Sequence, residues 1–200
     1  MNKREKNQTS VRKATLVVSF TLQALLLIIV GAGTASAHPL GYDSVDGDQI
    51  IYKDKTRYNK ELNFAVRQWN ELGSVSIEKG GNRQPGTDLV VRDYRNCKDG
   101  LFGYYEQKKG ADVIGLNSCT LNKNKYDAVD RRGTVVHEMG HALGLADNNL
   151  CNRSIMCGHG QTPFDTPQKH DVHDYYRLWP PEEEVSAPPA SSATSIAPGG

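Results

Sequence analysis

The stretch from 127 to 143 constrains the fold most, because its pattern predicts one long helix with two histidines on the same face. His137 and His141 are four residues apart, and side chains at that spacing lie one above the other along a helix. Both imidazoles can therefore reach one metal ion. Glu138 follows the first histidine and is placed to take a proton from a water bound to that ion. Taken alone, these five residues could also be a chance match with two ordinary hydrogen-bonded histidines.

The residues after this helix offer a third ligand. A zinc ion bound by two helical histidines needs a third protein ligand and an open position for water. Gly144 can adopt a left-handed conformation that ends the helix in a sharp turn, and Asp147 can then return to the metal. Taken singly, Gly144 would be an ordinary helix end and Asp147 a solvated carboxylate. Behind two histidines we expect Asp147 to be the third ligand, since a metal site requires this completion.

Residues 137–147 have the pattern H-E-x-x-H-x-x-G-x-x-D, which resembles the metzincin motif of zinc metalloproteases in its aspartate-ended form. The sequence looks most like the snapalysin family of small secreted neutral proteases, and the order of its predicted elements is similar to that of matrixins. The resemblance implies a zincin fold, with a mixed twisted sheet, an active-site helix and a small C-terminal lobe closed by a helix. It also implies that Met156 forms a structural Met-turn beneath the metal.

The sequence departs from the common metzincin pattern at two positions. Most metzincins have histidine where Asp147 stands, which separates this chain from the matrixins. Cys157 follows Met156, in place of the tyrosine that some branches use as an extra ligand. No tyrosine ligand is therefore expected.

The first 37 residues have the pattern of a secretory signal peptide. A basic stretch precedes an apolar run from Leu16 to Val30, and Ala35-Ser36-Ala37 provides a cleavage site. We expect cleavage after Ala37, a secreted extracellular protein, and no stable association with a membrane once the signal is removed. An uncleaved membrane anchor is the alternative, because the apolar run approaches the length that spans a bilayer.

The four cysteines all follow this signal. In an exported protein an even number of cysteines is expected to form disulfides. Short loops close most easily, so we favour Cys97–Cys119 and Cys151–Cys157 among the three possible pairings. A four-cysteine zinc site is the alternative, but the spacings lack the C-x-x-C pairs that are usual in such sites.

The rest of the chain predicts an α+β catalytic domain over residues 38–180. Strands are expected over residues 49–53, 75–78, 88–94, 101–107 and 111–116, and further helices over 58–72 and 166–179. In the last helix Thr166 is the expected N-cap and Pro167 the first helical residue. His159, His170 and His173 are expected to face solvent. Residues 181–200 are rich in Pro, Ser and Ala, and we expect them to form a disordered tail.

The charge balance argues against two classes of partner. The whole chain has a net charge of +1, but its first 13 residues contain five basic residues and one acidic residue. The remaining chain therefore has 19 basic and 22 acidic residues. This mildly acidic balance argues against nucleic acid or an anionic membrane surface as a partner.

Together these features predict a secreted zinc endopeptidase that acts on protein or peptide substrates, with one catalytic Zn²⁺ and Glu138 as general base. The resemblance implies that the substrate lies extended along an edge strand, which the chain order assigns to residues 101–107. A non-catalytic secreted module stabilised by zinc and a zinc amidohydrolase for non-peptide amides are the alternatives. We expect a monomer. A calcium ion is compatible with such a domain, although nothing in the sequence indicates one.

Overall fold

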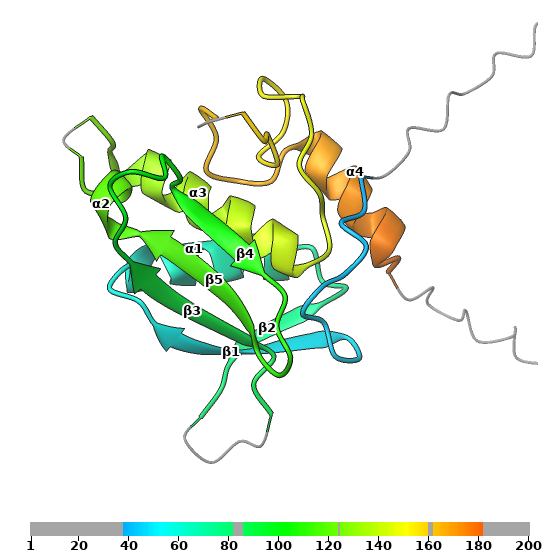
Figure 1. Cartoon of the computed structure of the whole chain (residues 1–200). Coiled ribbons are helices and arrows are strands. Elements are labelled where there is room, and N and C mark those ends of the chain that lie inside the picture. Colours follow the sequence, from blue (N-terminus) through cyan, green and yellow to red (C-terminus); the bar gives the residue numbers. More distant parts are fainter. Residues whose placement is uncertain (1–37, 82–85, 124, 160–161, 182–200) are drawn as a thin grey trace, which may run out of the picture. The chain divides into compact units, whose positions relative to one another are not determined.

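Five strands form one mixed sheet in the computed structural model (Figure 1). The structure describes residues 38–81, 86–123, 125–159 and 162–181. The predicted signal peptide (1–37) and residues 182–200 of the predicted tail lie outside the described residues. The strand order is β2-β1-β3-β5-β4. The strands are β1 Gln49–Lys55, β2 Ser76–Lys79, β3 Leu89–Tyr94, β4 Gly103–Glu106 and β5 Asp112–Asn117.

Strand β4 differs from the others in direction and position. It runs antiparallel to β5, with Tyr105 opposite Ile114, whereas the other neighbouring strands are parallel. Strand β5 is buried along its whole length, as an inner strand covered on both faces should be. Strand β4 therefore forms an edge of the sheet, within the range predicted for a strand over residues 101–107.

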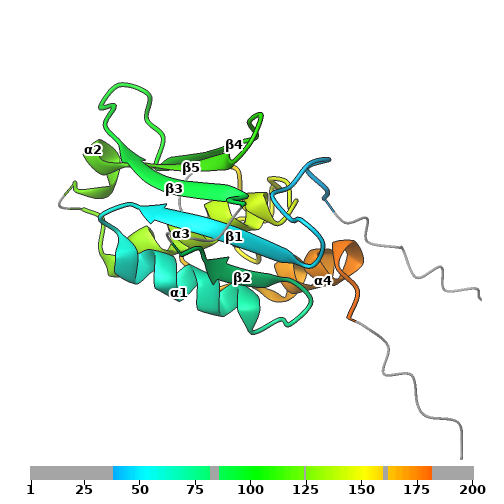
Figure 2. The same ribbon diagram turned by 90° about the horizontal axis from the view of Figure 1, so that it is seen from below.

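Two long helices cover one face of the sheet (Figure 2). Helix α1 spans Asn59–Asn70 and helix α3 spans Ala128–Ala142. The apolar residues whose spacing predicted this helix form its buried face, which contains Leu62, Ala65 and Trp69. The indole N–H of Trp69 donates to the carbonyl of Val136 at 3.0 Å. This bond joins α1 to α3 inside the core and fixes the orientation of the helix that bears both motif histidines.

Both ends of α3 agree with the sequence prediction to within one residue. At its start the Asp127 carboxylate accepts hydrogen bonds from the N–H groups of Val129 and Asp130, and the Asp130 carboxylate accepts one from the Asp127 N–H. At its end Gly144 has φ of 85°, a left-handed conformation that favours glycine. The predicted turn after the helix is therefore confirmed.

Helix α4, Lys169–Leu178, is the last helix of the described chain and contributes Tyr175 to the core. The Tyr175 side chain is fully buried, and its hydroxyl accepts a hydrogen bond from the Val75 N–H at 2.8 Å. Its ring centroid lies 5.9 Å from that of Trp69 in α1. The last helix of the chain therefore packs against the same core as α1.

The predicted start of α4 was wrong. Gln168, rather than Thr166, is the N-cap, and Pro167 lies before the helix. The Asp171 carboxylate accepts a hydrogen bond from the Gln168 N–H at 2.7 Å. This interaction satisfies a backbone donor at the helix start and fixes the boundary two residues later than the Thr-Pro pattern suggested.

Both disulfides have the pairing that short loops favour, Cys97–Cys119 and Cys151–Cys157. No cysteine is left free for a four-cysteine zinc site. The Cys97–Cys119 bond lies at helix α2, Ser118–Leu121, which the sequence did not predict. Asn117 caps α2 by accepting a hydrogen bond from the Cys119 N–H at 3.0 Å. A four-residue helix is too short for its periodicity to be recognised in a sequence.

The observed architecture confirms the predicted α+β class, with a mixed sheet and few helices. None of the helices in the described ranges is both long and apolar enough to cross a membrane.

Candidate metal centre

The three predicted ligands converge at the C-terminal end of α3. His137 Nε2 lies 3.2 Å from Asp147 Oδ1, and His141 Nε2 lies 3.4 Å from the same oxygen. The two imidazole rings are perpendicular, with centroids 4.7 Å apart. Ligand atoms about 2.0–2.2 Å from a tetrahedral zinc ion are about 3.3–3.6 Å from each other. The three side chains therefore have the spacing that one zinc ion requires.

Backbone carbonyls orient both histidines for this arrangement. His137 Nδ1 lies 2.8 Å from the carbonyl oxygen of Ile155, and His141 Nδ1 lies 2.7 Å from that of Leu145. A carbonyl can only accept a hydrogen bond, so each Nδ1 donates. Each Nε2 faces Asp147 and is the nitrogen that a metal ion can bind once the ring is neutral. This second hydrogen bond on each ring is typical of metal-binding histidines.

Two glycines make room for Asp147. Gly144 turns the chain at the end of α3, as described above, so that residues 145–147 run back toward the histidines. A Cβ atom at Gly158 would lie 3.0 Å from both Cβ and Cγ of Asp147. The Asp147 side chain remains 55% exposed, which leaves the centre open to solvent on one side. The Gly158 contact has no local sequence pattern and was not predicted.

Glu138 is a residue of α3, and its side chain packs against the edge strand β4. Its side chain is buried, and a Cβ atom at Gly103 in β4 would lie 2.8 Å from Glu138 Oε1. Burial raises the pKa of Glu138, while the neighbouring His137 and His141 lower it. A carboxylate of raised pKa beside two candidate metal ligands can exchange a proton nearer neutral pH than an exposed one.

The candidate ligands also change each other's pKa. Hydrogen bonds from His137 and His141 lower the pKa of Asp147 well below its usual range. Burial would lower the pKa of His137, but Asp147, Glu138 and the Ile155 carbonyl raise it to about 9. A metal ion requires a neutral imidazole, so it must displace the proton that His137 otherwise retains.

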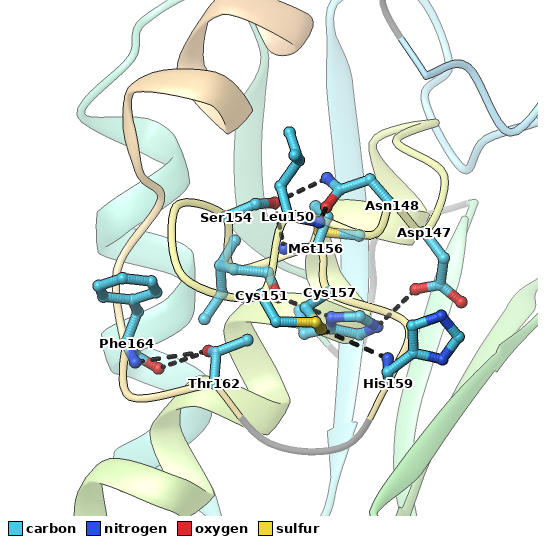
Figure 3. The surroundings of a disulfide bond; sticks show 12 residues. Asp147, Asn148, Leu150, Cys151, Ser154, Met156, Cys157, His159, Thr162 and Phe164 are labelled. Atoms are coloured by element: carbon cyan, nitrogen blue, oxygen red, sulfur yellow. Dashed lines mark hydrogen bonds and ion pairs between the residues drawn. A yellow bond between two sulfur atoms is a disulfide. The ribbon is translucent and has the colours of Figure 1, made fainter.

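Met156 lies on a buried turn beneath α3. Its sulfur would be 2.4 Å from a Cβ atom at Gly140, so a larger residue at that position would displace the Met156 side chain. The turn also provides the Ile155 carbonyl that orients His137. Figure 3 shows Met156, Asp147 and the Cys151–Cys157 disulfide in the same neighbourhood.

Helix α4 supports this turn through Asp171, a residue that no sequence pattern marks as part of the site. Its carboxylate is 1% exposed and accepts hydrogen bonds from the Ser154 hydroxyl and from the Ile155 N–H, the latter at 2.8 Å. The same carboxylate caps α4 at Gln168. Because Asp171 is 16 residues from Ile155 in the chain, no local pattern could reveal the contact.

The other predicted histidines have different environments. His159 and His173 are exposed, as expected. His170 was expected to face solvent but is only 23% exposed, and its ring lies beside Asp174.

A pocket joins the candidate ligands to the edge strand. It is lined by His137, Glu138, His141 and Asp147 on one side and by residues 102–105 of β4 and the preceding turn on the other. The arrangement can therefore place a ligand between the candidate metal-binding side chains and an edge strand.

The sequence matches the family model of the Dual-action HEIGH metallo-peptidase over residues 48–163, which is more than half of the chain. In the motif of that name the chain has Met139 where the family name has isoleucine. No curated protein matches the sequence significantly.

Similar folds occur among solved structures. A chain of the ECX AB5 holotoxin in its GM1-bound form is 15% identical, with 72% of this chain and 86% of that chain covered and a TM-score of 0.51. Myroilysin is 13% identical over 73% of this chain and 99% of its own, with a TM-score of 0.49. Archaemetzincin from Methanopyrus kandleri is 13% identical over 67% of this chain and 97% of its own, with a TM-score of 0.47. At these identities the holotoxin chain shows a shared fold alone, and the two lower scores support no conclusion. The family match shows that this chain belongs to the Dual-action HEIGH metallo-peptidases and is a metallopeptidase, with zinc as the metal that the family implies.

Proposed function

We propose that this chain is a secreted endopeptidase of the metzincin type, in which His137, His141 and Asp147 bind one catalytic zinc ion. The spacing of 3.2 and 3.4 Å between the histidine nitrogens and one Asp147 oxygen is the observation that carries the proposal. The donor set also fits, since two imidazoles and a carboxylate with an open fourth position are typical of catalytic zinc. The aspartate ligand is the reason to place the chain nearer the snapalysin family than the matrixins.

Glu138 is the general base in this proposal. When bound, zinc supplies a Lewis acid that lowers the pKa of a coordinated water and polarises the substrate carbonyl. Glu138 removes a proton from the attacking water and later delivers it to the leaving amine. Its burial between α3 and Gly103 supports this role, because the carboxylate is held beside the ligands and its pKa is raised.

The substrate would lie along β4. This strand pairs with β5 on one side, and residues 103–105 of the strand line the pocket that contains the candidate ligands. An extended peptide can add to such an edge through main-chain hydrogen bonds, while pockets for its side chains determine specificity. Placement beside Glu138 would bring one peptide bond of the substrate to the reacting groups.

The proposed maturation and assembly follow from the sequence. Cleavage after Ala37 would release an extracellular enzyme without stable membrane association, and one copy of the chain contains the whole candidate site, so it would act as a monomer. N-terminal sequencing of the secreted protein and light scattering test these two points.

Hydrolysis of casein and of a labelled peptide tests the proposed activity. The purified protein should cleave both, lose activity with a chelator and recover it when zinc is restored. Glu138→Ala, treated in the same way, is the control for a contaminating protease. Zinc binding without cleavage of any peptide would favour a non-catalytic module, and cleavage of only non-peptide amides would favour an amidohydrolase.

A further inference from the structure

A second cluster of metal-binding side chains lies at α4, apart from the motif. It contains His38, which precedes β1, and His170 and Asp174, which are one turn apart on α4. Asp174 Oδ2 is 3.0 Å from His38 Nδ1 and 3.3 Å from His170 Nδ1. His38 and Asp174 are 136 residues apart in the chain, so only the fold brings these groups together.

The geometry of this cluster is close to that of the candidate catalytic centre. Each cluster has two imidazole nitrogens facing one carboxylate oxygen. The nitrogen–oxygen distances are 3.0 and 3.3 Å at α4 and 3.2 and 3.4 Å in the motif. Donor atoms around a tetrahedral zinc ion are separated by about 3.3–3.6 Å. The His170–Asp174 distance falls in this range, and the His38–Asp174 distance of 3.0 Å is slightly shorter, so the spacing of the second cluster is close to that of a zinc site.

The hydrogen bonding of His170 is incomplete. Its Nδ1 is buried and makes no hydrogen bond within the described part of the chain, although Asp174 Oδ2 is only 3.3 Å away. Buried polar atoms normally have a partner. Atoms that bind one metal ion point toward the ion rather than toward each other, and an ion would supply the missing partner of His170 Nδ1.

The buried carboxylate and the partly exposed histidine of the cluster are also compatible with a bound ion. The Asp174 side chain is 4% exposed, and a carboxylate in such a dry environment needs positive charge beside it, which a metal ion between His38 and His170 would supply. The His38 side chain is 43% exposed and leaves a path for an ion to enter. His173 Nδ1 lies 3.4 Å from the other carboxylate oxygen, Oδ1, and is therefore outside the set of three donors.

We propose that His38 Nδ1, His170 Nδ1 and Asp174 Oδ2 form a second binding site for a divalent transition-metal ion such as zinc. Two imidazoles and one carboxylate match the ligand preferences of that ion. The backbone nitrogen of His38 also lies 3.3 Å from Asp174 Oδ2. If the chain is cut after Ala37, as proposed above, this nitrogen becomes a terminal amine and a fourth donor.

The position of the cluster indicates a structural role. The His38 carbonyl accepts a hydrogen bond from the Ala146 N–H at 2.7 Å, and the Leu40 N–H donates to the Gly144 carbonyl at 2.7 Å. Residues 38–40 thus pair with the segment that leads into Asp147. An ion at this site would tie that segment to α4 without contacting the reacting groups.

Zinc stoichiometry tests the proposal. The purified protein, dialysed against excess zinc and then against buffer, should retain two zinc ions per chain by mass spectrometry. His170→Gln should retain one and keep its peptidase activity. His173→Gln, on the same helix, is the matched control and should retain two. His38→Gln provides a second variant at an exposed position, in case the change in α4 impairs folding, and it should also retain one.

The His137→Ala variant separates this site from the catalytic centre. It should keep the α4 ion and lose the other, whereas the double variant with His170→Gln should bind none. If the zinc count falls with His170→Gln but not with His137→Ala, the catalytic assignment fails and the second site stands. Retention of two ions by both His170→Gln and His38→Gln would overturn the proposal. So would one ion in the unaltered protein that is lost with His137→Ala, because His38 and His170 would then form only ion pairs with Asp174.

Discussion

Residues 128–147 and residues 148–179 contribute to the candidate centre in different ways. The first segment contains Glu138 and all three proposed ligands within eleven positions of the chain. The second contains none of them, but it provides the Ile155 carbonyl that orients His137, Met156 beneath Gly140, and Asp171, which supports the turn. The reacting groups are therefore close together in the sequence, whereas the residues that support them are not. Changes in the first segment should therefore affect chemistry, and changes in the second should affect stability and geometry.

The largest effect should come from Glu138→Ala in the first segment. The proposed proton transfer contributes on the order of a hundredfold to ten-thousandfold to the rate. We expect kcat/KM for a labelled peptide to fall by that factor, while zinc content and melting temperature stay near those of the unaltered protein. Glu71→Ala, at an exposed position after α1, is the control and should leave activity unchanged. Near-normal turnover of Glu138→Ala would show that another group is the base.

Asp147→Ala should weaken zinc binding, because it removes one of three proposed ligands. Asp147→His should restore much of it, since imidazole is also a good zinc ligand. Zinc content after dialysis measures both effects. Catalytic zinc that is unchanged in the alanine variant would mean that the third ligand lies elsewhere.

In the second segment, Asp171→Ala should mainly reduce stability. It would leave the buried N–H of Ile155 and the hydroxyl of Ser154 without their acceptor, and each unsatisfied group costs about 1–3 kcal/mol. We expect the free energy of unfolding, measured by denaturant titration, to fall by about 2–4 kcal/mol. Asp171→Asn keeps one acceptor oxygen and should recover part of the loss. A stability change only in Glu138→Ala, and none in Asp171→Ala, would reverse the comparison.

The two disulfides should have smaller effects that differ between the two regions. Cys151–Cys157 brackets the Met156 turn and closes a short loop, worth about 2 kcal/mol by chain entropy, whereas Cys97–Cys119 closes a longer one worth about 3 kcal/mol. Replacing both Cys151 and Cys157 by Ser should lower activity more than melting temperature. The corresponding change at Cys97 and Cys119 should do the reverse. Equal effects of the two pairs on activity would show that the Cys151–Cys157 disulfide does not hold the Met156 turn in place beneath the candidate centre.

Local sequence patterns predicted most of the fold. The helical patterns of residues 58–72 and 127–143 predicted α1 and α3 to within two residues. All five strands were predicted, because each is a short apolar or alternating run between turn residues. The order of strands in the sheet was not predicted, except for the edge position of β4, which came from a resemblance. Pairing between distant strands depends on the whole chain rather than on local pattern.

The same limit applies to the site. His137, Glu138 and His141 could be found because helical spacing alone places them together, and Gly144 because a left-handed turn favours glycine. The start of α4 was placed wrongly at Thr166, because the dominant interaction is the Asp171 carboxylate, which bonds both Gln168 and the turn at Ile155. Contacts such as Gly158 with Asp147, or His38 with Asp174, join positions that only the folded chain brings together.

Anomalous diffraction from crystals of the zinc-loaded protein would show whether His137, His141 and Asp147 bind one zinc ion. A zinc ion should lie about 2.0–2.2 Å from His137 Nε2, His141 Nε2 and Asp147 Oδ1, with one open position facing Glu138 and β4. An ion that leaves Asp147 uncoordinated, or the absence of any zinc between His137 and His141, would contradict the proposed centre.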